Sequence, residues 1–235
     1  MLSFKNSGFI ILTLFPLLLC TTSNAAIILE DRLCIAGEEI MLSAETKKGL
    51  FRKGGVVVEF FINKRSIGKS LSGGDGMAYK AFIPLNTGLM KLSVKDNDEE
   101  AKALMLCLKK GQAILLIDIE TAKETPFSSM PRKDSREVIK RLSRRFPVVY
   151  LLTGFMSQRE AKGWLQKNGY PLAPVLAFKE EIFSELKEMG LLIRAVIASP
   201  QIAELAASYR LRIFSFDEVE GAIEVDSWKE LEKKI

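Results

Sequence analysis

Histidine is absent from this chain of 235 residues, and cysteine and tryptophan are scarce, with 3 and 2 residues. Without histidine the chain has no Ser-His or Cys-His catalytic pair, no histidine metal ligand and no histidine pH switch. The cysteines form no CxxC pair, which argues against a structural zinc site. Basic stretches interleaved with glycine and aromatic residues are also missing, so we expect no nucleic-acid binding.

Hydrophobic runs long enough to cross a membrane are missing after the first 25 residues. The apolar run Phe9–Leu19 has about eleven residues, whereas a spanning helix needs about twenty. The following Ser23-Asn24-Ala25 fits the small-x-small pattern that signal peptidase cleaves. We therefore expect residues 1–25 to be a signal peptide and the mature chain to be exported, to the periplasm or outside the cell. Lipidation at Cys20 is an alternative that the bulky Leu19 disfavours.

Two cysteines, Cys34 and Cys107, remain after the expected signal peptide. Export takes a protein to an oxidising compartment, where two cysteines allow one disulfide. A bridge that closes a loop of about 73 residues would stabilise the fold by roughly 4 kcal/mol. The alternative is two buried thiols that lie too far apart to bond.

Residues 26–109 have the pattern of a β-sandwich, because short β-branched and aromatic runs alternate with turns every eight to twelve residues or so. This region resembles bacterial immunoglobulin-like domains of the invasin type. The matching segments are Ala36-Gly37-Glu38, Gly55-Val56-x-Val58-x-Phe60, Ile67-Gly68, Gly76-Met77-Ala78 and Pro84-x-x-x-Gly88-x-Met-Lys-Leu92. A module of this kind presents loops, spaces other domains or binds partners, and its fold alone names no activity.

Residues 110–235 alternate apolar strands with amphipathic helices, which predicts a doubly wound α/β sheet without a cap domain. Three expected strands end in polar residues: Ala113–Ile117 before Asp118, Val148–Leu152 before Thr153, and Ile193–Ile197 before Ser199. Open α/β sheets place their sites at this edge. The pattern therefore predicts a candidate site made of these strand ends.

The same region resembles the haloacid dehalogenase (HAD) superfamily, in its lipin-like and acid-phosphatase-like branches, with degenerate motifs. The segments that carry the resemblance are Asp118-Ile-Glu120-Thr-Ala122, Leu151-Leu-Thr153-Gly154, Trp164-Leu165, Asn168-Gly169-Tyr-Pro171, Pro174-Val-Leu176 and Ile197-Ala198-Ser199-Pro200-Gln-Ile202. The fold class that the two resemblances imply is an immunoglobulin-like β-sandwich followed by a HAD-like, Rossmannoid α/β domain.

The resemblance implies a role for each matching residue. Asp118 would be the nucleophile and Glu120 the general acid and base, while Thr153, Gly154 and Lys179 would hold the phosphoryl group. In the family, two further acids and the first aspartate bind Mg²⁺, but Ala198 and Ile202 stand at those positions. Asp118 alone is a poor Mg²⁺ site, because this ion needs several oxygen ligands. We therefore expect no cofactor, or Mg²⁺ if the domain is active.

The sequence thus predicts an exported protein whose second domain is non-catalytic and binds a phosphorylated or anionic ligand or an envelope protein. The alternatives are a Mg²⁺-dependent phosphatase with a replacement acid such as Asp217, and a spacer without a ligand. At the level of residues, Asp118 and Glu120 could be loop carboxylates held by backbone amides. Thr153 could cap a helix, and Lys179 could be a solvated lysine in a charged run.

Overall fold

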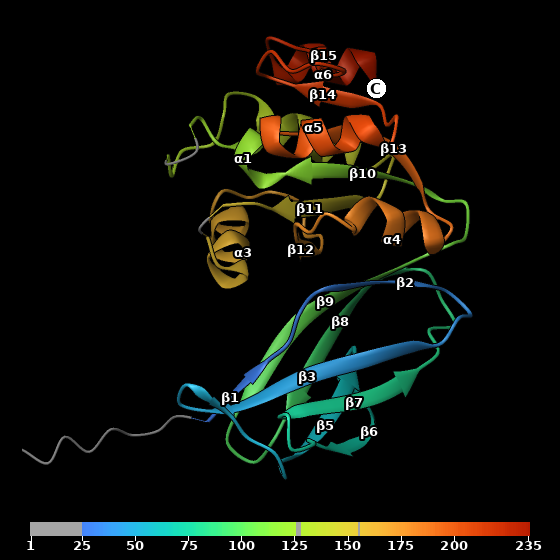
Figure 1. The fold of residues 1–235 in the computed structure, drawn as a ribbon, viewed down its shortest axis with the longest axis vertical. Helices are drawn as coiled ribbons and strands as arrows, with labels where there is room; N and C mark the ends of the chain where they lie inside the picture. The colour runs from blue at the N-terminus through green and yellow to red at the C-terminus, as the bar shows by residue number, and fades with distance from the viewer. Residues whose placement is uncertain (1–24, 126–127, 155) are drawn as a thin grey trace, which may run out of the picture.

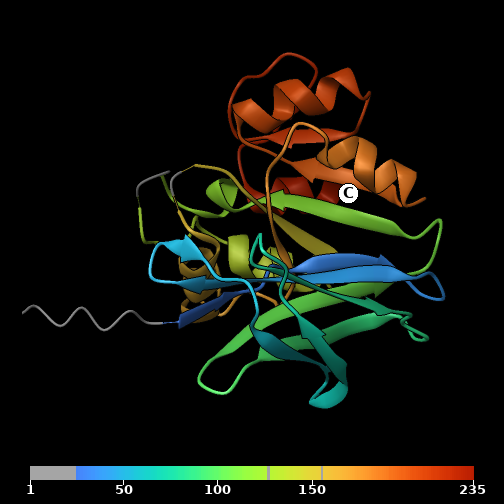
Figure 2. The ribbon, with the colours of Figure 1, turned by 60° about the horizontal axis from the view of Figure 1, so that its bottom comes forward.

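The computed structural model describes residues 25–125, 128–154 and 156–235. The protein has two lobes stacked along its long axis (Figure 1). Figure 2 shows the same division after a turn of 60°, with the blue and green strands of the first lobe below and the orange and red segments of the second lobe above. The expected signal peptide and the lipidation candidate Cys20 fall on residues outside the described part, apart from Ala25.

The first lobe is a β-sandwich of two sheets. One sheet has the order β1–β3–β4, with β7 also paired to β3, and the other has the order β2–β9–β8–β5–β6. The strands are β1 (Ala25–Ile28), β2 (Arg32–Ile35), β3 (Ile40–Lys48), β4 (Phe51–Arg52), β5 (Val57–Ile62), β6 (Arg65–Leu71), β7 (Met77–Phe82), β8 (Gly88–Lys95) and β9 (Glu100–Leu108).

Alternation along the strands builds the core of the sandwich. In β3, Leu42 and Ala44 point into the core. Met41 lies on the opposite face of the strand and is half exposed. Phe60 of β5 and Leu92 of β8 complete the buried centre. A period of two residues is what places every second side chain on one face of a sheet.

A disulfide joins Cys34 and Cys107 inside this core. The two residues are direct partners in the parallel pair β2 and β9, and their Cα atoms are 4.6 Å apart. The bridge therefore holds a strand from the start of the sandwich against its last strand.

The second lobe has a sheet of parallel strands in the order β12–β11–β10–β13–β14–β15. The strands are β10 (Ala113–Asp118), β11 (Val148–Leu152), β12 (Val175–Ala177), β13 (Leu192–Ile197), β14 (Ile213–Ser215) and β15 (Ile223–Glu224). The helices are α1 (Ile119–Ala122), α2 (Ser135–Leu142), α3 (Gln158–Lys167), α4 (Ile182–Glu188), α5 (Pro200–Ser208) and α6 (Trp228–Lys234).

Helices cover both faces of this sheet. On one face, α2, α3 and α6 pack on Leu115 and Ile117 of β10. On the other face, α4 and α5 pack on Ile114 and Leu116, and this core continues into the sandwich through β2 and β9. Local signals set the helix ends, as in α3, where Ser157 and Glu160 form a capping box.

The predicted fold class, with a HAD-like doubly wound domain as its second half, is wrong. Strands make up 39% of the described residues and helices only 22%, so that sheet dominates this part of the chain. Apolar strands that alternate with amphipathic helices form parallel sheets in many unrelated proteins. The pattern therefore did not single out the family that we inferred from it.

Asp31 connects the two lobes through its buried carboxylate. The carboxylate accepts hydrogen bonds from the backbone amides of Leu104, at 2.6 Å, and Val175, at 2.8 Å. The Lys162 ammonium of α3 lies 2.6 Å from the same group. One side chain from the sandwich thus accepts hydrogen bonds from backbone amides of both lobes.

Candidate functional site

The first candidate site lies where β10, β11 and β13 end. Asp118 is the last residue of β10, Thr153 follows β11, and Ser199 follows β13. Because these strands are parallel neighbours in register, their ends meet at one edge. The structure therefore brings together the three polar strand ends that the sequence singled out.

Asp118 is completely buried, and both of its carboxylate oxygens are occupied. Oδ1 accepts from the Thr153 hydroxyl at 3.0 Å and from the Glu120 amide at 3.1 Å. Oδ2 accepts from the Ser199 hydroxyl and from the Ser199 amide at 3.3 Å. Asp118 also caps the short helix α1. The carboxylate therefore ties three strand ends together.

Glu120 is held by a lysine that the sequence analysis missed. The Lys123 ammonium lies 2.9 Å from Oε1 of Glu120, and only 4% of the Lys123 side chain is exposed. Oε2 of Glu120 is buried without a hydrogen-bond partner among the described residues. The spacing of three residues on a helical turn is the signal that could have revealed this pair.

The other predicted phosphate ligands lie in exposed turns. Gly154 is exposed and has a left-handed backbone with φ of +77°. Lys179 is exposed in the turn before α4, where its carbonyl accepts from the Ile182 amide. Thr153 does not cap α3, since Ser157 is the capping residue.

The site does not fit Mg²⁺. Ala198 and Ile202, at the positions of the family's metal-binding acids, are completely buried in the apolar core. Asp217, the replacement acid considered above, is exposed. Within residues 25–125, 128–154 and 156–235, no three Asp, Glu, Cys or His side chains come together as a metal site.

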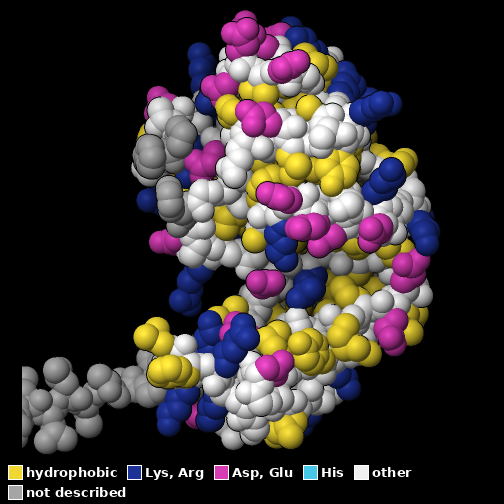
Figure 3. Space-filling model, in the orientation of Figure 1, with side chains coloured by type: hydrophobic (Ala, Val, Ile, Leu, Met, Phe, Trp, Pro, Cys, Tyr) yellow, Lys and Arg dark blue, Asp and Glu magenta, His cyan; other side chains and the backbone are white. Residues whose placement is uncertain are grey.

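The second candidate site is a groove between the lobes, with a volume of about 880 Å³. Figure 3 shows a hollow between the lobes on the side where α3 lies. One wall is the outer face of β5, β8 and β9, and the other is formed by α3 and the segment that leads into β12. Its lining residues are Phe61, Lys64, Lys91, Leu92, Ser93, Lys95, Glu100, Lys102, Ala103, Leu104, Lys162, Leu165, Gln166, Tyr170, Pro171, Leu172, Ala173 and Val175.

The groove combines an apolar surface with positive charge. Five lysines and one acid, Glu100, line it. Glu100 lies 3.4 Å from Lys95 and 3.1 Å from Lys102. The hydrogen bond from Lys102 is the main cause that lowers the pKa of Glu100. Leu172 is 65% exposed and supplies apolar surface.

No protein-family model matches the sequence, and no curated protein matches it either. Among the described residues, no helix has both the length and the hydropathy to cross a membrane.

Several solved structures are similar to part of the chain. The D00-D0 domain of intimin has 18% identity and a TM-score of 0.30 over 37% of this chain and 46% of that chain. Invasin, a bacterial integrin-binding protein, has 14% identity and a TM-score of 0.30 over 39% of this chain and 22% of that chain. Fibronectin(III)-like modules of CbhA from Clostridium thermocellum have 13% identity and a TM-score of 0.28 over 37% of this chain and 98% of that chain.

These comparisons overturn the inferred HAD resemblance and the phosphohydrolase-like function drawn from it. The matches are immunoglobulin-like bacterial domains and fibronectin-like folds, and no haloacid dehalogenase appears among them. The descriptions HAD-like, hydrolase-like and phosphatase are therefore wrong for this chain. The strand-end residues that suggested them make the contacts of a buried structural network.

Proposed function

We propose that this chain is an exported binding protein that holds an acidic segment of a partner protein in the groove between its lobes. The observation that carries the proposal is the groove itself, in which apolar surface and five lysines face one acid. A bound segment would cover lysines that are largely exposed in the free protein. Because buried charges without partners are unfavourable, a ligand with carboxylates suits these lysines better than a neutral or basic one.

The walls of the groove favour a protein segment over a compact small molecule. Lys91, Ser93 and Lys95 project at alternate positions from β8, as outward side chains of a strand do. Opposite them, Leu172 presents apolar surface next to the short strand β12. An extended segment that alternates acidic and apolar side chains matches this spacing, because its side chains also alternate between two faces.

Part of the positive charge of the groove remains available to a ligand, because salt bridges within the protein neutralise only some of its five lysines. Lys162 is paired with Asp31, and Lys95 and Lys102 share Glu100. Lys64 and Lys91 are exposed on the same wall. Exposed cations of this kind contribute to the rate and specificity of association more than to affinity.

A location outside the cytoplasm is consistent with the disulfide between Cys34 and Cys107, since such bonds persist in oxidising compartments. The sequence pattern of residues 1–25 favours export as well. We place the protein in the periplasm or outside the cell. Intimin has a complex with the translocated intimin receptor, and invasin is an integrin-binding protein. The proposal rests on the groove and not on these two proteins.

The test is a binding titration with a short, fluorescently labelled peptide that alternates leucine and glutamate, followed by anisotropy. We expect Lys91→Glu and Leu172→Ser each to weaken binding by about tenfold, through lost charge attraction and lost apolar contact. The matched controls are Lys233→Glu on α6 and Leu192→Ser on β13, which are exposed outside the groove lining.

A peptide with lysine in place of glutamate is the matched ligand control. Equal binding of the two peptides, or equal losses in the groove variants and the control variants, would show that the groove does not select acidic segments. Binding of the acidic peptide alone, lost only in the groove variants, would support the proposal.

A further inference from the structure

The hairpin between β3 and β4 ends in two strongly exposed apolar side chains. Leu50 is 93% exposed and Phe51 is 79% exposed. Single apolar residues on a protein surface are normal, but two large ones in succession at the end of a hairpin present a projecting apolar surface. We call Leu50 and Phe51 the apolar tip.

The backbone explains why the tip projects. Lys47 pairs with Arg52 and Lys48 with Phe51, which leaves Gly49 and Leu50 as the turn. Gly49 has φ of +62°, a conformation that glycine adopts without strain. Two-residue turns of this kind make a tight hairpin. Leu50 therefore lies at the very end of the hairpin.

Four cations flank the tip. They are Lys47, Lys48, Arg52 and Lys53, which we call the basic collar. Glu45 is the acid that meets them, at 3.6 Å from Lys47 and 2.7 Å from Arg52. Four cations and the single acid Glu45 leave a net positive charge around the apolar tip.

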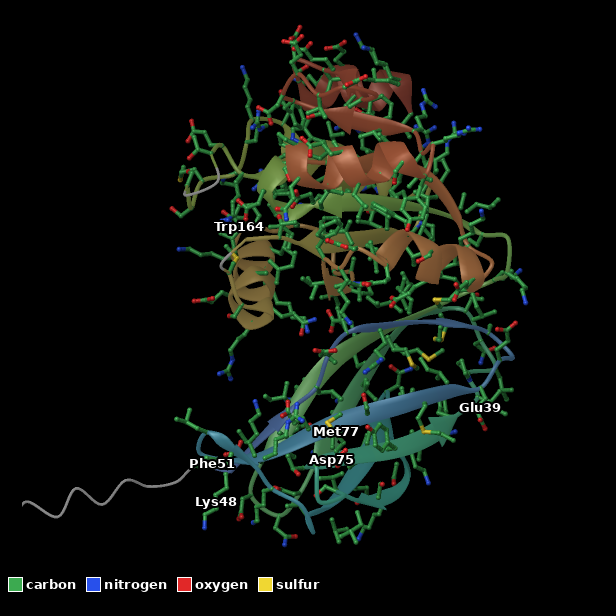
Figure 4. All side chains as sticks on the ribbon, in the orientation of Figure 1. Glu39, Lys48, Phe51, Asp75, Met77 and Trp164 are labelled. Atoms are coloured by element: carbon green, nitrogen blue, oxygen red, sulfur yellow. A yellow bond between two sulfur atoms is a disulfide. The ribbon has the colours of Figure 1, made fainter. Side chains whose placement is uncertain are left out.

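The other end of the sandwich provides a contrast. Leu85 is 83% exposed there, and the acids on this end are Glu38, which is paired with Lys110, and Glu39. The Gly37 amide donates to the carbonyl of Pro84, which places Glu38 and Glu39 beside Leu85. Figure 4 shows Lys48 and Phe51 at one end of the sandwich and Glu39 at the other. The two ends therefore differ in charge but share an exposed apolar residue.

We propose that the apolar tip and its basic collar dock this protein on an anionic phospholipid surface. Apolar side chains insert at the boundary of head groups and acyl chains, while lysine and arginine reach the phosphates around them. Each cation near an anionic bilayer adds to the attraction. A receptor protein with an acid-rimmed pocket is the competing occupant, and the experiment below distinguishes the two.

Strand β1 runs beside the hairpin, and Ala25 pairs with Lys48. Ala25 therefore lies at the end of the sandwich that carries the tip.

The test places an indole at the tip. The variant Phe51→Trp is mixed with vesicles of equal parts phosphatidylglycerol and phosphatidylcholine, and the emission of the wild type, from Trp164 and Trp228, is subtracted. We expect a shift to shorter wavelength and quenching by brominated acyl chains. Vesicle affinity should be at least about tenfold higher than with phosphatidylcholine alone. Adding Lys48→Glu and Lys53→Glu should remove this difference.

Leu85→Trp is the matched control, because it places an indole on an equally exposed apolar position with acidic neighbours. Its emission should not change with either vesicle. The readout is local, so that membrane attachment through another segment does not produce it. No shift for Phe51→Trp, an equal shift for Leu85→Trp, or an equal shift with neutral vesicles would overturn the proposal and leave a protein as the occupant of the tip.

Discussion

At the scale of single residues, Asp118 shows how one carboxylate can organise a strand edge. Its two oxygens serve the Thr153 hydroxyl, the Ser199 hydroxyl and two backbone amides. A buried carboxylate in such a position is favourable only when its hydrogen bonds are complete. The same completeness leaves neither oxygen directed at a ligand.

Replacement of Asp118 by alanine should therefore destabilise the fold. We expect a loss of about 3 kcal/mol, because buried hydroxyl and amide donors would lose their acceptor. Chemical denaturation in urea measures the change. Asp217→Ala, at an exposed position after β14, is the control and should change stability by less than about 0.5 kcal/mol. Equal effects of both substitutions would contradict a structural role for Asp118.

At the scale of elements, the pair β2 and β9 depends on a covalent bond. The disulfide between Cys34 and Cys107 closes a loop with a sequence separation of 73 in the middle of the pair. Strand β2 has only four residues and forms an edge of its sheet. Few backbone hydrogen bonds therefore hold this strand, and the covalent bond limits how far it can separate from β9.

The double variant Cys34→Ala and Cys107→Ala should lose about 4 kcal/mol of stability, since the unfolded chain regains the freedom that the bridge removes. The measurement is the urea midpoint of the variant against the wild type, with and without reductant. Reductant should lower the wild-type midpoint toward that of the variant and leave the variant unchanged. An unchanged wild-type midpoint in reductant would show that the bridge does not stabilise the fold.

The secondary structure was largely readable from local signals. The sequence predicted amphipathic helices between the apolar strands of residues 110–235, and the structure has α2 between β10 and β11 and α4 between β12 and β13. The strand-end residues Asp118, Thr153 and Ser199 were also expected at one edge. Capping residues and apolar periodicity are local, so a sequence displays them directly.

Features that depend on tertiary contacts were not readable. The groove unites residues from Phe61 to Val175, which have no common pattern in the sequence. The pair of Glu120 and Lys123 has only its spacing of three residues as a signal, and that spacing is common in sequences. The turn at Gly49 and Leu50 was missed, because the short strand β4 carries little hydrophobic signal. The HAD inference failed for a related reason, since polar residues after parallel strands occur whether or not a site is present.

At the scale of the whole molecule, Asp31 adds a polar contact to the apolar core that joins the two lobes through β2 and β9. Its carboxylate is fully buried and accepts from Leu104 of the sandwich and Val175 of the second lobe, while Lys162 pairs with it. Removal of the carboxylate would leave the buried Val175 amide without an acceptor and Lys162, which is 28% exposed, without its partner. The groove lies directly beside this contact, since Lys162, Leu104 and Val175 also line it.

Asp31→Ala should therefore loosen the lobes and cost about 3 kcal/mol or more. Small-angle scattering should give a larger radius of gyration, and hydrogen exchange should increase at Leu104 and Val175. Glu38→Ala, which breaks the exposed pair with Lys110 at 3.1 Å, is the control and should have an effect below about 1 kcal/mol. Unchanged scattering in Asp31→Ala would contradict the coupling of the lobes.

The contacts of Asp31 also set an order of events during synthesis. This residue meets Lys162 and Val175 across sequence separations of 131 and 144. A ribosome must therefore have made most of the chain before the carboxylate finds its partners. Contacts between distant positions slow folding, and the unfinished surface is prone to aggregate. A chain that waits in this way is well suited to being kept unfolded until its translation and transport are complete.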